Sequence, residues 1–279
     1  MNLASAIQFG QVVDAAYAVP SDDLANRAGQ FVQVGTGAAA ASYEVVTSIY
    51  ANDLATQMNP LRAQSIVSIG LVLQASKAGD AVIALRGTEG IMEWVQDARF
   101  LAVPCPFLPG AGNTEDGFTA MYNSLAISTA SGSPSVIKAL GTLAWRRPVT
   151  SLTVCGHSLG GALAVDLAAH APPPFNTPEV YTYASPRTGD PTFASTYDHL
   201  VPNTSRIANR MDLVPNLPTP PLYEHVLGLF ELNPIELGLP PKVLVKMTLP
   251  CEHALNTYLY LLSRAAGGNV IPLDASCVP

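Results

Sequence analysis

Residues 153–161 constrain the fold of this chain more than any other stretch. They read Thr-Val-Cys-Gly-His-Ser-Leu-Gly-Gly: a short apolar run, a G-x-S-x-G turn, and the start of an alanine-rich segment that favours a helix. A strand-to-helix corner of this kind strains the backbone and points the hydroxyl of Ser158 away from it. Gly156 and Gly160 fit because a Cβ atom at either place would clash across the turn. The alternative is a glycine-rich turn with an incidental serine, so the rest of the chain must supply the partners.

Composition limits the classes of protein to which the chain can belong. Its 279 residues suit one large α/β domain, and no linker, charge block or repeat divides them. The net charge of −7, without a Lys/Arg cluster, argues against nucleic-acid binding. Charged residues make up 13%, about half of the usual ~25%. Such a surface would tolerate lipid, although a bland alanine-rich surface is an equally simple interpretation.

The sequence gives little indication of a targeting segment, a zinc site or a dense set of disulfides. No apolar run is long enough to span a bilayer, and the first residues lack the basic start of a signal peptide. The four cysteines are too scattered for a zinc site or a dense disulfide framework. Cys155 lies in a predicted core strand and is expected to be a buried thiol. Cys251 and Cys277 could close the C-terminal segment if the protein is exported.

Strands and helices are expected to alternate along the chain. Apolar, β-branched runs predict strands at residues 43–50, 66–74, 81–85, 151–155, 180–184 and 205–209. Helical spacing predicts helices at residues 3–17, 115–127, 135–143, 160–170, 191–199 and from about 252 to 267. This order is typical of the α/β class, with a mostly parallel sheet and helices on both faces. Residues 215–250 are rich in proline and leucine and are predicted to form an irregular loop, a wall of a substrate cleft.

A serine at such a corner becomes a nucleophile only if a base takes its proton and a carboxylate orients that base. After a G-x-S-x-G turn the expected order is Ser, Asp or Glu, then His. His170 falls at the far end of the helix after Ser158, and His199 precedes the strand expected to carry the acid. His253 and His225 remain, and the order favours His253 because a strand-end site could receive a residue near the C-terminus.

The acid and the oxyanion donors are sought at strand ends, where ligands gather in open α/β sheets. Asp212 directly follows the strand at residues 205–209 and is the favoured acid, whereas Asp190 looks like a helix cap before Pro191 and Asp198 lies near the end of that helix. For the oxyanion, one donor is the backbone N–H of Leu159. Thr88, after the strand at residues 81–85, offers a second N–H and a hydroxyl.

Several motifs in this order resemble those of the class 3 lipases, a family of fungal-type triacylglycerol lipases that includes feruloyl esterases and bacterial members. The similar segments are Arg86-Gly87-Thr88 with Trp94 and Asp97, Gly117-Phe118 with Tyr122, Gly156 to Ala162, Pro186-Arg187 with Gly189-Asp190, Asn209 to Pro218, and Tyr223 to Val226. In the last segment the family's histidine is not the base, which leaves His253. Departures are Asp116 where a histidine is usual, and Ala184-Ser185 in place of Phe-Gly.

The resemblance implies an α/β-hydrolase fold, carboxylic-ester substrates, secretion, and a mechanism without metal or cofactor. Ser158 would attack the ester, His253 would take its proton, and Asp212 would hold the imidazole. Thr88 and Leu159 would stabilise the oxyanion. The substrates would be acylglycerols or other lipid esters, met at a lipid–water interface. The alternatives are a hydrolase of soluble esters, of the feruloyl-esterase type, and an inactive binding protein on the same fold.

Residues 89–100 follow the predicted oxyanion turn. Their apolar side chains cluster on one side of a short helical stretch: Ile91, Met92, Trp94 and Val95. An ordinary amphipathic helix packed on the core would show the same pattern. The resemblance implies instead a mobile lid that opens where a lipid interface stabilises the open state.

Overall fold

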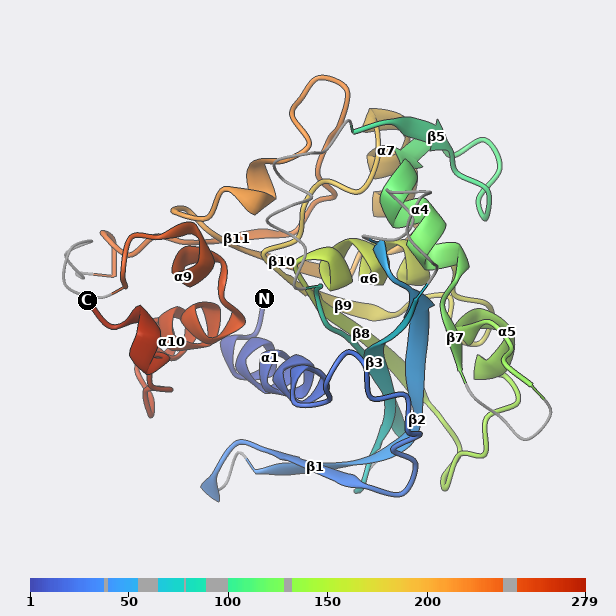
Figure 1. Cartoon of the computed structure of the whole chain (residues 1–279), viewed down its shortest axis with the longest axis horizontal. Helices are drawn as coiled ribbons and strands as arrows, with labels where there is room; N and C mark the ends of the chain where they lie inside the picture. Colours follow the sequence, from blue (N-terminus) through green and yellow to red (C-terminus); the bar gives the residue numbers. More distant parts are fainter. Residues whose placement is uncertain (38–39, 55–64, 78, 89–99, 128–131, 238–244) are drawn as a thin grey trace.

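The computed structural model describes residues 1–37, 40–54, 65–77, 79–88, 100–127, 132–237 and 245–279. Its centre is a mixed sheet with strand order β1-β2-β3-β4-β8-β9-β10-β11, in which β7 pairs with β2 (Figure 1). Strands β4, β8, β9, β10 and β11 pair in parallel, whereas β1, β2, β3 and β7 pair antiparallel, and β3 is antiparallel to β4. This confirms the predicted α/β class with a parallel central part.

Six strands of the sheet, β2, β3, β4, β8, β9 and β10, lie close to the predicted runs, whereas β1, β7 and β11 were not predicted. The bounds of the strands are β1 Phe31–Val34, β2 Ala41–Asn52, β3 Ile66–Ala75, β4 Asp80–Leu85, β7 Ala126–Ile127, β8 Ser151–His157, β9 Glu179–Tyr183, β10 Thr204–Asn209 and β11 Leu229–Leu232. Side chains alternate between the two faces, as the pleat requires. In β4, Ile83 and Leu85 join one core cluster, while Val82 and Ala84 join the other.

Helices cover both faces of the sheet, with α1 Leu3–Tyr17 and α10 Leu255–Ala266 together on one face (Figure 1). On the other face α6 Leu159–His170 packs with α4 Asp116–Asn123 and α5 Val136–Leu140. The outer side of α6 contacts α7 Pro191–Leu200 in a third cluster. Because β8 and α6 are buried in the middle of these layers, the corner between them has a fixed position.

The remaining described elements are short. They are the strand pair β5 Ala102–Pro104 and β6 Asn113–Glu115, the 3₁₀ turns η2 Val214–Asn216 and η3 Ala275–Cys277, and the five-residue helix α9 Leu249–His253. The prediction of one helix over residues 115–127 was too long. Helix α4 ends at Asn123, where the side chain of Ser124 donates to the carbonyl of Met121, and β7 then pairs with β2.

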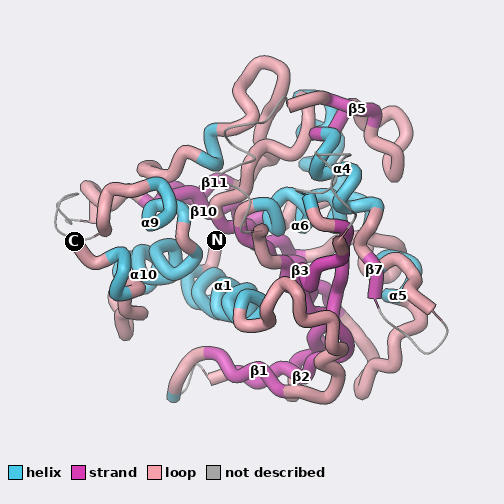
Figure 2. The backbone as a smooth tube through the Cα atoms, viewed as in Figure 1, coloured by secondary structure: helices cyan, strands magenta, loops and turns pink. Residues whose placement is uncertain are grey.

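Two features of the C-terminal third differ from the prediction. Residues 215–250 contain a strand, β11, which pairs in parallel with β10 at the edge of the sheet (Figure 2). The expected single helix near Glu252 is two helices, because Ala254 has an extended backbone, with ψ of 134°, between α9 and α10. Gly267 ends α10 in the left-handed conformation, at the predicted end of the helix.

Asp166 is an unusual residue in the middle of α6. Its side chain is fully buried, and neither carboxylate oxygen has a hydrogen-bond partner among the residues that the structure describes. Burial, helped by the nearby Glu115, raises the pKa of Asp166 well above its ordinary value. Burial likewise raises the pKa of Glu115 to about 7. The folded protein therefore keeps a proton on Asp166 that the unfolded chain releases above about pH 4.

This buried acid predicts a pH-dependent stability. Because the pKa of Asp166 is higher in the folded state, the free energy of unfolding falls as pH rises from about 4 towards the folded pKa, by up to about 1.4 kcal/mol per pH unit. The Asp166→Asn variant cannot titrate there, so its curve should fall less steeply in urea unfolding at pH 5, 6 and 7. The exposed Asp22→Asn variant controls for the lost charge. Parallel curves for wild type and Asp166→Asn would contradict this account.

No helix in the described part of the chain combines the length and the apolar character needed to cross a membrane.

Candidate active site

Ser158 lies at the corner between β8 and α6. Its backbone has φ of 59° and ψ of −129°, a strained conformation for a residue that is not glycine. A Cβ atom added to Gly156 would lie 2.0 Å from the carbonyl oxygen of Gly160, and one added to Gly160 would lie 2.4 Å from that of Leu85. Both glycines are thus required by close backbone approaches, which is the geometry expected from the G-x-S-x-G pattern.

His253 is the imidazole that contacts Ser158. Its Nε2 lies 2.8 Å from the Oγ of Ser158, and its Nδ1 lies 2.8 Å from the Oδ2 of Asp212. All three side chains are buried. With Nδ1–H donating to the carboxylate, Nε2 is free to accept the proton of the serine hydroxyl. The structure therefore brings together the serine, histidine and aspartate that were predicted from three distant parts of the sequence.

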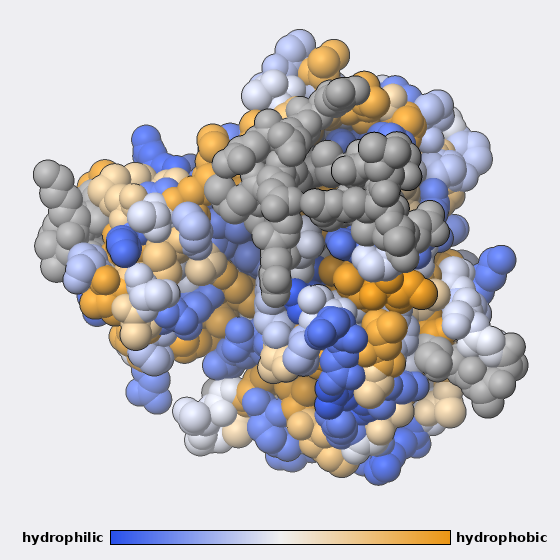
Figure 3. Space-filling model, viewed as in Figure 1, coloured by the Kyte–Doolittle hydropathy of each residue, from blue (hydrophilic) through white to orange (hydrophobic). Residues whose placement is uncertain are grey.

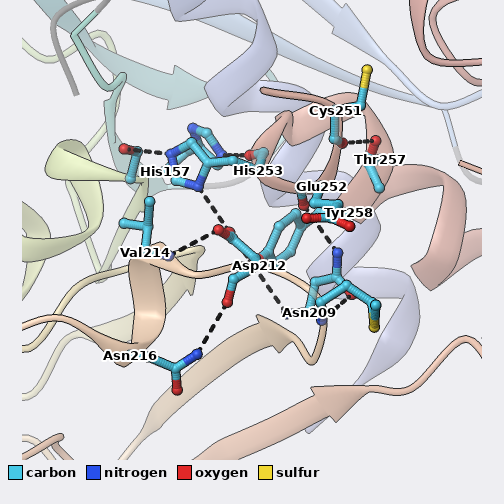
Figure 4. Close-up of polar contacts among 12 residues, drawn as sticks. His157, Asn209, Asp212, Val214, Asn216, Cys251, Glu252, His253, Thr257 and Tyr258 are labelled. Carbon is cyan, nitrogen blue, oxygen red and sulfur yellow. Dashed lines mark hydrogen bonds and ion pairs between the residues drawn. The ribbon is translucent and has the colours of Figure 1, made fainter. Parts of the chain in front are cut away.

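Asp212 follows β10 and its carboxylate accepts further hydrogen bonds (Figure 4). The backbone N–H of Val214 donates to Oδ1 at 3.0 Å, and the hydroxyl of Tyr258 donates to Oδ2 at 2.8 Å. Asn216 donates from its side chain to the backbone carbonyl of Asp212 at 3.2 Å. These contacts fix the orientation of the carboxylate towards His253, which is the role that an acid of this kind needs.

Tyr258 is a site residue that the sequence analysis missed. It lies within the helix predicted from about residue 252 to 267, and its side chain is fully buried there. Burial raises the pKa of its hydroxyl well above the ordinary value, so the hydroxyl keeps the proton that it donates to Asp212. It also accepts the backbone N–H of Asn209 at 3.0 Å. A tyrosine within an apolar helical stripe, five residues after the candidate base, is the signal that was available.

The short helix α9, which carries His253 as its last residue, is held from two sides. The side chain of Asn209 donates to the carbonyl of Glu252 at 2.9 Å, and Thr257 donates to that of Cys251 at 2.6 Å (Figure 4). A disulfide joins Cys251 to Cys277, as the sequence had allowed. Five residues make a marginal helix by themselves, so these links hold the imidazole in place.

The other histidines lie in different surroundings. His225 donates from Nε2 to the carbonyl of Pro215 at 2.6 Å, and burial, with Arg206 nearby, lowers its pKa to about 3. His170 pairs through Nδ1 with the hydroxyl of Tyr122 at the far end of α6. His199 bonds through Nδ1 to the carbonyl of Ser195, one turn earlier in α7.

The other candidate acids have structural partners. Asp190 caps α7 by accepting the backbone N–H of Phe193 at 2.8 Å, as its position before a proline predicted. Asp198 accepts the N–H of Leu227 at 2.9 Å. Among the three candidates, only Asp212 has a hydrogen bond to His253 in the described structure.

The predicted oxyanion donors flank Ser158. Leu159 is the first residue of α6, where backbone N–H groups have no partner within the helix. Thr88 follows Gly87, and a Cβ atom added to Gly87 would lie 2.9 Å from the Cβ of Ser158. The turn after β4 thus passes directly beside the serine. The assignment of Thr88 and Leu159 to the oxyanion stays a prediction.

The predicted lid residues Ile91, Met92, Trp94 and Val95 lie outside the described residues. Within the described ranges, no group of three or more His, Cys, Asp or Glu side chains is placed to hold a metal ion.

Proteins similar in sequence are lipases and phospholipases. Phospholipase A1-II 3 of Oryza sativa subsp. indica is 33% identical over 172 residues, which cover 51% of this chain and 40% of that protein. The secreted mono- and diacylglycerol lipase 1 of Fusarium solani is 28% identical over 139 residues, covering 50% of this chain and 39% of that protein. The matched region is thus only about 40% of the length of these relatives.

Similar solved structures share the fold. A fungal lipase matches with a TM-score of 0.60 and 22% identity, covering 82% of this chain and 78% of that one. A triacylglycerol lipase whose catalytic centre is described as a serine protease triad matches with a TM-score of 0.52 and 17% identity, covering 81% and 78%. The chain therefore has the α/β-hydrolase fold. The family model for lipase (class 3) matches residues 82–221, half of the chain, and the chain belongs to the class 3 lipase family.

Proposed function

We propose that this chain is a serine hydrolase that cleaves carboxylic esters of lipids. The observation that carries the proposal is the continuous hydrogen-bonded chain from the Oγ of Ser158 through His253 to Asp212, at a strand-to-helix corner. A serine, a base and an orienting carboxylate in this geometry are the parts that acyl transfer requires. Family membership favours an ester over an amide as the substrate.

The reaction follows from the positions of these atoms. Ser158 attacks the ester carbonyl carbon while its proton passes to Nε2 of His253, and Asp212 stabilises the imidazolium that forms. The N–H groups at Leu159 and Thr88 stabilise the negative oxygen of the tetrahedral intermediate. His253 then gives the proton to the leaving alcohol. Water, activated by the same imidazole, releases the acyl group from Ser158.

Exposed leucines, one of them next to Asp212, support a lipid substrate. Leu213 follows Asp212 directly and is 46% exposed, while Leu101 and Leu222 are 58% and 72% exposed. The segments of the last two are joined by the hydroxyl of Tyr223, which donates to the carbonyl of Phe100 at 3.0 Å. Figure 3 shows apolar and hydrophilic residues interspersed on one face of the molecule. An exposed leucine directly after the aspartate of the triad suits contact with acyl chains.

A panel of substrates tests the class of ester. We expect hydrolysis of emulsified di- and triacylglycerol or of phospholipid vesicles, and of p-nitrophenyl esters of increasing chain length, with higher kcat/KM for the longer acyl chains because these bury more apolar surface. Methyl ferulate represents the soluble-ester alternative. Higher kcat/KM on methyl ferulate and acetyl esters than on every lipid would reject a lipid-ester hydrolase, and no turnover of any ester would reject hydrolase activity altogether.

A further inference from the structure

A buried tyrosine from the N-terminal helix reaches the catalytic region. Tyr17 is the last residue of α1, and its hydroxyl lies 2.8 Å from the backbone nitrogen of Gly87 and 2.7 Å from Nδ1 of His157. His157 precedes Ser158 in the chain, and its Nε2 lies 2.8 Å from the backbone carbonyl oxygen of His253. Tyr17 and His157 therefore join the turn after β4 to the histidine that contacts Ser158.

The direction of every hydrogen bond in this chain of groups follows from its ends. The N–H of Gly87 can only donate, so the hydroxyl of Tyr17 accepts from it and must donate its own proton to Nδ1 of His157. The carbonyl of His253 can only accept, so Nε2 of His157 carries the hydrogen. Each polar group is satisfied in one arrangement only, with His157 neutral and protonated at Nε2.

The surroundings keep both side chains in these protonation states. Burial raises the pKa of the Tyr17 hydroxyl to about 12. Burial, followed by the proximity of His253, holds the pKa of His157 well below its ordinary value. Arg86 fixes the tyrosine from the other side, because its guanidinium lies 5.1 Å from the ring centroid and donates to the carbonyl of Val19 at 3.0 Å. Neither Tyr17 nor His157 changes charge near neutral pH.

We propose that Tyr17 and His157 are positioning residues. They hold the turn at Gly87 and the imidazole of His253 in fixed positions relative to Ser158. The inference rests on the proposed hydrolase function. Gly87 immediately precedes Thr88, a predicted oxyanion donor, and His253 is the last residue of a five-residue helix whose position needs outside support. The hydroxyl of Tyr17 accepts the hydrogen bond from the N–H of Gly87, and Nε2 of His157 donates to the carbonyl of His253. Neither residue exchanges a proton with the substrate.

The Tyr17→Phe variant tests this role. It removes the acceptor of the Gly87 N–H and the donor to His157 while keeping the ring. We expect kcat on a soluble p-nitrophenyl ester to fall about 10- to 100-fold, because a misplacement of about 1 Å costs as much, with KM within about twofold. Tyr197→Phe is the matched control, since the hydroxyl of Tyr197 in α7 is also on a buried side chain and hydrogen-bonds to Thr204 of β10, away from the triad. A kcat for Tyr17→Phe within twofold of that control would overturn the proposal.

Two substitutions of His157 separate positioning from packing. His157→Gln keeps an N–H for the carbonyl of His253 and an oxygen for the Tyr17 hydroxyl, whereas His157→Leu keeps neither. We expect His157→Gln to retain most of the wild-type kcat and His157→Leu to lose about as much as Tyr17→Phe. Equal losses of kcat in the two variants, compared at equal folded fraction, would show that the hydrogen bonds of His157 do not matter, and would overturn its positioning role.

The tautomer of His157 gives a readout that does not depend on activity or on any variant folding. In ¹⁵N-histidine-labelled wild-type protein, NMR should show His157 neutral with its proton on Nε2 from pH 6 to 8. A proton on Nδ1, or a charged ring, would overturn the inference. Ser158→Ala keeps the failures distinguishable: if it stays active, the proposed function fails, whereas if it is inactive and Tyr17→Phe is not impaired, only the positioning role fails.

Discussion

The Ser158→Ala variant should lose ester hydrolysis by a factor of about 10⁴ or more in kcat while remaining folded. The Oγ of Ser158 is the atom that carries the acyl group in the acyl-enzyme. The three residues of the triad act together, so without this nucleophile only the catalysis due to the oxyanion donors and to substrate binding remains. The backbone at this corner is fixed by the close approaches at Gly156 and Gly160 rather than by the serine side chain. The measurement is kcat with a p-nitrophenyl ester, together with the melting temperature.

Covalent labelling checks the same assignment independently. A fluorophosphonate probe should modify Ser158 in the wild type, as peptide mass spectrometry would show, and should modify nothing in the alanine variant. Ser263→Ala is a matched control, because that hydroxyl is also buried but bonds within α10 to the carbonyl of Tyr260. Label on a different residue, or an alanine variant with wild-type kcat, would remove Ser158 from the mechanism.

The parts of this site that could be predicted from the sequence are those encoded by local patterns. The corner at Ser158 follows from two glycines and a serine at fixed spacing, and Asp212 from its place directly after a predicted strand. The central strands were found for the same reason, since a buried parallel strand is a short apolar run between turn residues. In each case a few neighbouring residues determine the local conformation.

The features that were missed depend on contacts between distant segments. Strand β11 forms because β10 supplies an edge for it to pair with, although residues 229–232 lie in a segment rich in proline. The break at Ala254 has no proline or glycine to announce it. Tyr258 and Tyr17 read as ordinary members of apolar helix faces, and only the folded chain shows which of their hydroxyl groups meet Asp212 and His157. Periodicity predicts burial but not the partner of a buried polar atom.

The His253→Ala variant should be nearly as inactive as Ser158→Ala, with a loss of at least about 10⁴-fold in kcat, because among the described residues Nε2 of His253 is the base that hydrogen-bonds to the serine hydroxyl. Without the imidazole the hydroxyl of Ser158 stays protonated near neutral pH, and the leaving alcohol has no acid. The buried carboxylate of Asp212 keeps the N–H of Val214 and the hydroxyl of Tyr258 as donors, so the variant is expected to fold.

His225→Ala is the matched control for His253→Ala. It also removes a largely buried imidazole, that of the other histidine considered as the base. Its contact is with the carbonyl of Pro215, and its low pKa keeps it neutral at pH 7. Loss of that hydrogen bond should lower the free energy of unfolding by roughly 1–3 kcal/mol and leave kcat within a few-fold of wild type. If instead His225→Ala were folded and inactive while His253→Ala turned over ester, the base would be His225, and the contact between His253 and Ser158 would be structural.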